Sequence, residues 1–355
     1  MHRPHLDFVA ALHRQLPAEG NLCWSPYSVA AALGLAAAGA RGATRDQLAA
    51  ALAPGGELAE LGRVLADSAA LAEAEVAVAN TLWVERQAQF QDAYLQAVRE
   101  LPGGALRTAD FLHDAEGARV AINDDVERTT RGLIKELVGQ GMLSADTIAV
   151  IVNALYLKVA WLSAFEAAAT APAPFHASSG TRQVPTMRQQ ESLRYAAAGG
   201  WRMVTLPTAA PVVVDVLLPD GPPELPPAEV LAALQEASRP TKVDVTLPRF
   251  RVEAAAVLND PLRQLGVASA FVPGEADFSG ITDQVRIFVD LVLHKAVLRV
   301  DEQGFEGAAA TAVVMRMVSV DLSTPVPFHV DRPFLVLVRH PRTGAVYFVA
   351  RVVEP

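Results

Sequence analysis

The side chains that most often carry catalysis or hold metal ions are few and widely spaced in this chain. Of its eight histidines, only His2 and His5 stand close together in the sequence, at the N-terminal end. The single cysteine, Cys23, excludes an intramolecular disulfide, and we expect it to be a small buried hydrophobic residue. These spacings predict neither a metal ion nor another cofactor.

Sequence patterns of known enzyme classes are missing from the chain. It contains no G-x-S-x-G, no H-E-x-x-H, no glycine-rich phosphate loop and no G-x-G-x-x-G. His294 stands in the apolar stretch LVLHKAVL, which is typical of a core histidine satisfied by hydrogen bonds rather than of a catalytic one. The sequence therefore predicts that the protein is not an enzyme.

Composition indicates a folded chain with a large core. Of 355 residues, 51% are hydrophobic and 19% are charged. The net charge of −9 and the absence of a basic block argue against a nucleic-acid partner. No apolar run reaches the 18 residues of a membrane span, and the N-terminus lacks the pattern of a signal peptide. We expect a cytoplasmic protein, or an exported one whose signal lies outside this sequence.

The secondary-structure elements that must position these side chains change from mainly helices to mainly strands along the sequence. Ser25-Pro26 is typical of an N-cap followed by proline at the first helical position, and the helix would run to Gly39. A further helix is predicted over 117–137, and a strand over 76–85. The nearly continuous apolar run 148–158 predicts a strand buried on both faces, where Asn153 must find partners. Helices first and strands later indicate one α+β domain, residues 1–355, with mainly antiparallel sheets.

One stretch, from Asp301 to Phe328, has no clear preference for either helix or strand. Its alanines favour a helix, whereas its valines and threonine favour an extended chain. Composition alone would also fit a flexible surface linker. If it is a strand, almost every side chain on both faces is small, and one face carries Phe305, Gly307, Ala309 and Thr311.

Several short motifs, in order along the chain, make it resemble a serpin. The first is Ser-Pro-x-Ser at 25–28, and the next is NALYLK at 153–158 followed by Trp161. Then come LPRF at 247–250, ADFSG at 276–280, HKAV at 294–297 and DRPF at 331–334. Each motif is weak alone, but the resemblance extends over nearly the whole length.

This resemblance implies three β-sheets, about nine helices and a mobile reactive-centre loop, here residues 302–327. It also implies an inhibitor of serine-type endopeptidases that acts as a suicide substrate. A protease cleaves the loop and forms an acyl ester, and the freed loop inserts into the main sheet and distorts the protease. The implied partner is a serine protease of chymotrypsin, elastase or subtilisin type, in a covalent complex with a monomeric inhibitor.

The resemblance also assigns roles to single residues. The hinge of the loop would comprise Glu302, Gly304, Phe305, Gly307, Ala309 and Thr311. The scissile bond falls at Val318-Ser319, with Met317-Val318 as the next choice and Arg316 as the third. The first two would suit an elastase- or chymotrypsin-like protease. A hydrogen-bonded patch beneath the sheet, the shutter, would comprise Ser25, Ser28, Asn153 and His294. Trp161 and Gly304 would mark the breach, where the loop first enters the sheet.

Phe305 departs from the family pattern. It stands where the family usually carries a small hydroxyl residue, and by alternation its ring must enter the core, which puts fast insertion in doubt. The alternative function is therefore a non-inhibitory serpin fold with a binding or chaperone-like role.

Overall fold

The computed structural model of the chain describes residues 3–305 and 323–355. Within these ranges it contains eight α-helices and two short 3-10 helices, η1 at Ala167–Ala169 and η2 at Ser269–Phe271. The α-helices are α1 (Arg3–His13), α2 (Pro26–Gly39), α3 (Gly42–Leu52), α4 (Leu58–Asp67), α5 (Asp92–Glu100), α6 (Ala115–Thr129), α7 (Ala228–Ala237) and α8 (Asn259–Gln264).

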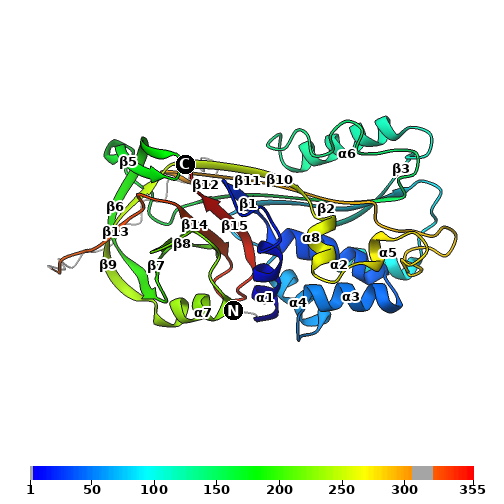
Figure 1. Ribbon diagram of the computed structural model, residues 1–355, viewed down its shortest axis with the longest axis horizontal. Helices are drawn as coiled ribbons and strands as arrows, with labels where there is room; N and C mark the ends of the chain where they lie inside the picture. The colour runs from blue at the N-terminus through cyan, green and yellow to red at the C-terminus, as the bar shows by residue number, and fades with distance from the viewer. Residues whose placement is uncertain (1–2, 306–322) are drawn as a thin grey trace.

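A six-stranded sheet crosses the middle of the molecule, with α6 on one face and α2 to α5 and α8 on the other (Figure 1). Its strands follow the order β10-β11-β12-β4-β2-β3, and β11 also pairs directly with β4. Their bounds are β2 (Glu75–Glu85), β3 (Gly104–Ala109), β4 (Ala149–Ala160), β10 (Phe250–Val257), β11 (Leu291–Asp301) and β12 (Gly304–Phe305).

Strand β4 has an apolar layer on each of its two faces. Its side chains alternate between two separate cores, because Ile151 and Leu155 pack in the α2 layer whereas Val150 and Val152 pack beneath α6. Eleven of its twelve residues are buried, as the apolar run in the sequence predicts. Its one buried amide, Asn153, is fully enclosed.

A nine-stranded sheet forms the other end of the molecule (Figure 1). The 19-residue strand β6 pairs in turn with β5, β9 and β7, so two of the three sheets implied by the resemblance share hydrogen bonds here. Its strands are β1 (Leu22–Trp24), β5 (Ala171–Ala177), β6 (Gly180–Ala198), β7 (Trp201–Pro207), β8 (Val213–Pro219), β9 (Arg239–Pro248), β13 (Val326–His329), β14 (Phe334–Arg339) and β15 (Val346–Val352). The α+β class is confirmed.

Helix α6 ends earlier than predicted, at Thr129 instead of residue 137. Arg131 and Gly132 both have a positive φ, 53° and 81°, and this takes the backbone out of the helical path. The Thr130 hydroxyl then accepts a hydrogen bond from the backbone N–H of Ile134. The helical periodicity of the sequence continues beyond Thr129, but hydrogen bonds from the backbone to side chains replace the helical ones there.

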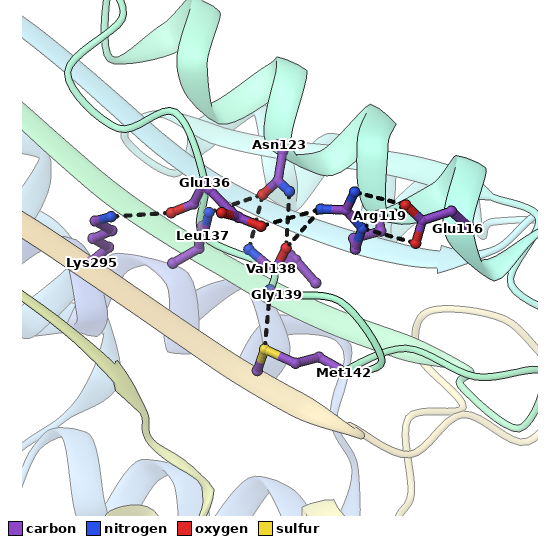
Figure 2. Close-up of polar contacts among 9 residues, drawn as sticks. All are labelled: Glu116, Arg119, Asn123, Glu136, Leu137, Val138, Gly139, Met142 and Lys295. Atoms are coloured by element: carbon purple, nitrogen blue, oxygen red, sulfur yellow. Dashed lines mark hydrogen bonds and ion pairs between the residues drawn. The ribbon is translucent and has the colours of Figure 1, made fainter.

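The segment 130–142 after α6, the strap, lies over the six-stranded sheet (Figure 2). Asn123 of α6 holds it, because its carbonyl oxygen accepts from the N–H groups of Leu137 and Val138, both at 2.9 Å. From the sheet below, Lys295 of β11 donates to the carbonyl oxygen of Glu136 at 3.1 Å. The strap therefore ties α6 to β11.

No helix within residues 3–305 and 323–355 is both long and apolar enough to cross a membrane. Over the same ranges, His, Cys, Asp and Glu side chains form no group of three that could hold a metal ion.

Candidate functional site

The two middle strands of the six-stranded sheet part near one end. Strands β4 and β11 pair in parallel from Leu291–Val150 to Ala296–Leu155. Beyond that point β12 lies between them, with Gly304 opposite Ala160 of β4 and opposite Asp301 of β11. The segment that follows β11 thus turns back and begins a new strand in the middle of the sheet.

Gly304 is required at this turn. Its φ is +143°, and a Cβ atom on it would lie 2.2 Å from the carbonyl oxygen of Val159 and 2.8 Å from the Cα of Ala160. No side chain fits there without moving β4 or β12.

Phe305 of β12 lies between the parted strands, and its ring is buried in the hydrophobic core. Phe305 lies opposite Val159 on one side and Val300 on the other, and its exposed fraction is 0%. Its ring centroid is 5.2 Å from that of Trp161, at an interplanar angle of 50°. The predicted direction of this side chain, into the core, is therefore the one seen.

Trp161 also holds the turn by its polar atoms. Its indole N–H donates to the carbonyl oxygen of Asp301 at 2.8 Å, and its backbone N–H donates to the carbonyl oxygen of Gln303 at 3.0 Å. The backbone N–H of Phe165 donates to the carbonyl oxygen of Glu302 at 3.0 Å. Every carbonyl of the turn from 301 to 303 is thus occupied.

Glu302 is a buried carboxylate with two partners. Arg249, which follows β9 in the LPRF motif, donates to it at 2.5–2.6 Å, and the hydroxyl of Thr170 donates to the same oxygen. Burial alone would raise the pKa of Glu302, but the hydrogen bonds from Arg249 and Thr170 outweigh it and lower the pKa. The carboxylate stays charged at neutral pH and anchors the turn between β11 and β12.

Further along the same two strands, the four predicted shutter residues come together. The backbone N–H of Ser25 donates to Nε2 of His294 at 3.0 Å, and the amide nitrogen of Asn153 donates to the Ser28 hydroxyl at 2.6 Å. Nδ1 of His294 meets the Asn153 carbonyl oxygen. The network links α2 to both β4 and β11, the strands that part at the breach.

Burial sets the protonation of His294. Complete enclosure lowers the pKa of its imidazole to about 3. Because Nε2 accepts from Ser25, the neutral ring carries its proton on Nδ1, where it donates to Asn153. The ring is thus a neutral structural link, as the sequence predicts.

The prediction from sequence missed Asn80 of β2. Its side-chain oxygen accepts from the Ser28 hydroxyl at 2.9 Å and from the Asn153 amide at 2.6 Å. The signal was present, because Asn80 is a lone amide in an apolar strand and stands opposite Asn153 in register. Arg249 and Thr170, the partners of Glu302, were missed because no local pattern connects them to the hinge.

Several predicted residues lie outside the described residues. These are the later hinge positions Gly307, Ala309 and Thr311 and the residues around the predicted scissile bond, Arg316, Met317, Val318 and Ser319. The described chain resumes at Ser323 and enters β13 at Val326.

The fold and the site together define the class: an α+β protein whose central sheet takes up a short strand from its own C-terminal segment. Residues 5–355 match the family described as Serpin (serine protease inhibitor). The chain belongs to the serpin family.

Relatives and solved structures agree with this assignment. The chain is 32% identical to the leukocyte elastase inhibitor of Homo sapiens, over 99% of this chain and 97% of that protein. Its fold matches uncleaved ovalbumin with a TM-score of 0.86 at 27% identity, covering 100% and 99% of the two chains. Human thyroxine-binding globulin matches with a TM-score of 0.87 at 25% identity, covering 99% and 97%.

Proposed function

We propose that this protein inhibits a serine protease as a suicide substrate, through a reactive-centre loop at about residues 302–327. The protease serine attacks a loop carbonyl, the peptide bond breaks, and an acyl ester joins the two proteins. The freed loop then adds to the six-stranded sheet between β4 and β11 and carries the protease with it before water hydrolyses the ester.

One observation supports this proposal above the others: β12 already lies between β4 and β11, paired with both. The path for an added strand therefore starts where the loop starts. Below it, β4 and β11 are joined by parallel pairing and by the shutter network, both of which must separate to admit further residues. Beyond Glu306, residues 307–312 are all small, which suits insertion.

For the target, we propose an elastase- or chymotrypsin-like protease that cleaves Val318-Ser319. The apolar residue before this bond suits the primary pocket of such enzymes, and the similarity to leukocyte elastase inhibitors also points to elastase. Cleavage at Met317-Val318 would suit the same class. Cleavage after Arg316 would require a trypsin-like target.

The test is incubation with elastase, chymotrypsin and subtilisin, followed by denaturing gels and intact-mass measurement. We expect an adduct that survives SDS with at least one of them, with the mass of the protease plus the chain up to the scissile bond. Val318→Asp should slow cleavage by an elastase-like enzyme, whereas Val320→Asp, two residues beyond, serves as the matched control. Cleavage without an adduct for every protease would leave the non-inhibitory, binding or chaperone-like function in its place.

A further inference from the structure

Phe305 makes a contact that a hinge of small residues could not make. A small hydroxyl side chain at this position would leave the space beside Trp161 unfilled, whereas the phenyl ring is fully buried there, 5.2 Å from the indole centroid. Trp161 in turn packs edge-on against Phe165, with centroids 6.1 Å apart at 72°. The rings of Phe305, Trp161 and Phe165 thus form one buried aromatic cluster next to β12.

We infer that Phe305 is a latch: it keeps the first two residues of the loop inserted in the sheet of the uncleaved protein. The ring buries apolar surface only when Gly304 and Phe305 occupy β12, so its burial favours the inserted hinge over an expelled one. Phe305 is a positioning residue, since it fixes Gly304 and itself in β12 between β4 and β11.

The backbone supports the latch independently of the ring. Gly304 has room for no Cβ atom beside Val159, so the close approach of the turn to β4 depends on this glycine. The carbonyls of Asp301 and Gln303 accept from the two N–H groups of Trp161. Trp161 therefore holds the hinge by its ring and by two hydrogen bonds. Its surroundings change according to whether Gly304 and Phe305 are inserted in the sheet or expelled from it.

Phe305 replaces the small hydroxyl residue that the family usually carries here, and the latch is an effect of this replacement other than slower insertion. Part of the insertion that the bulky ring would hinder has already occurred before cleavage. Because Gly304 and Phe305 are held in β12, fewer residues are left for a protease to engage, and we expect the first encounter with the protease to be slower. The effect on inhibition rests on the proposed function, whereas the inserted hinge itself does not.

The test compares Phe305→Ser with Gln303→Ser, an exposed neighbour in the same turn, in the full uncleaved chain. Hydrogen exchange would be read at the amides of Trp161 and Phe165, which donate to the hinge carbonyls. In Phe305→Ser we expect protection at these amides to fall by roughly ten- to a hundredfold and Trp161 fluorescence to shift to the red. Gln303→Ser should keep the protection at these amides. In every variant, the amides where β4 and β11 pair directly, at 150–155 and 291–296, should also stay protected.

A second variant, Gly304→Ala, tests the same inference with the ring retained. The added Cβ would meet the Val159 carbonyl, so the hinge should leave the sheet and the same amides should lose protection. Unchanged protection in Phe305→Ser would overturn the latch. If protection falls but no protease forms an adduct with any variant, the latch stands and the proposed function fails. If adducts form, we expect Phe305→Ser to associate with the protease severalfold faster than Gln303→Ser.

Discussion

At the scale of single residues, buried amides and one neutral imidazole join α2 to the strands β2, β4 and β11. Asn153 and Asn80 face each other across β4 and β2, and both bond to the Ser28 hydroxyl of α2. Because these hydrogen bonds are neutral, the proposed separation of β4 and β11 would leave no unpaired buried charge.

The first prediction concerns this network. Asn153→Ala should lower the free energy of unfolding by about 1–3 kcal/mol, because it leaves Asn80, Ser28 and His294 with unfilled bonds. Asn80→Ala should cost a similar amount, and the double variant less than the sum, because both remove parts of one network. Urea denaturation of the four proteins measures this. Strict additivity would show that the two amides act separately.

The second prediction concerns pH. Burial lowers the pKa of His294 to about 3 in the folded chain, against a value near 6.5 when unfolded. The unfolded chain therefore takes up the proton first, so stability is full above about pH 6.5 and falls as the pH drops from there toward 3. The slope from this residue is up to about 1.4 kcal/mol per pH unit.

His294→Gln should lower by one the number of protons taken up on unfolding, and so reduce the slope of stability against pH. Burial also lowers the pKa of His13, to about 4, so His13→Gln serves as a comparison that should reduce the slope over a similar range. Denaturant midpoints measured between pH 7 and 4 decide the matter. If His294→Gln has the same pH dependence as the unchanged protein, the histidine is not protected from protonation as the structure indicates.

At the scale of elements, the hinge is held by one ion pair in addition to the aromatic contact. Glu302 lies at the turn between β11 and β12, and Arg249 lies between β9 and β10. The pair therefore joins the turn to an edge of the same sheet. A change of sign at either residue would leave two like charges within hydrogen-bonding distance.

The third prediction follows from this pair. Glu302→Arg should release the hinge and raise hydrogen exchange at the Trp161 and Phe165 amides, because two guanidinium groups would face each other. The reversed pair, Glu302→Arg with Arg249→Glu, should restore a large part of the protection. Failure of the reversal to restore any protection would mean that Thr170 and the backbone, and not the charge, hold the turn.

The fourth prediction concerns the loop itself. Thr311 falls on the face that alternation places inward with Phe305, so Thr311→Arg would have to bury a charge on insertion. The variant should be cleaved by the target protease without forming an SDS-stable adduct. Ala308→Arg, on the opposite face, should still trap. Trapping by Thr311→Arg at the same yield would contradict the proposed strand alternation.

At the scale of the whole molecule, the sequence predicted some features well and others poorly. The α+β class, the doubly buried strand β4 and the N-cap at Ser25 follow from local patterns, and the structure contains all three. The early end of α6 did not follow, because Thr130 accepts from the backbone N–H of Ile134, and Asn123 accepts from backbone N–H groups 14 and 15 residues away. The partners of Glu302 come from residues 53 and 132 positions distant, which no periodicity connects.

Under the proposed function, the uncleaved fold would not be the most stable arrangement of this chain. About 15 loop residues added to the sheet would span roughly 50 Å at about 3.3 Å each. About a dozen new ladder hydrogen bonds would contribute roughly 6–18 kcal/mol. Because an uncut loop is tethered at both ends, we expect a barrier, and not equilibrium, to separate the uncleaved fold from the inserted one.

The most direct test is the thermal unfolding midpoint of the chain before and after a single cut in the loop, with the cut located by mass spectrometry. If the cleaved loop completes the strand begun at Gly304 and Phe305, the midpoint should rise by roughly 10 °C or more. A midpoint that stays the same or falls after cleavage would contradict insertion, and with it the proposal that the protein traps its protease.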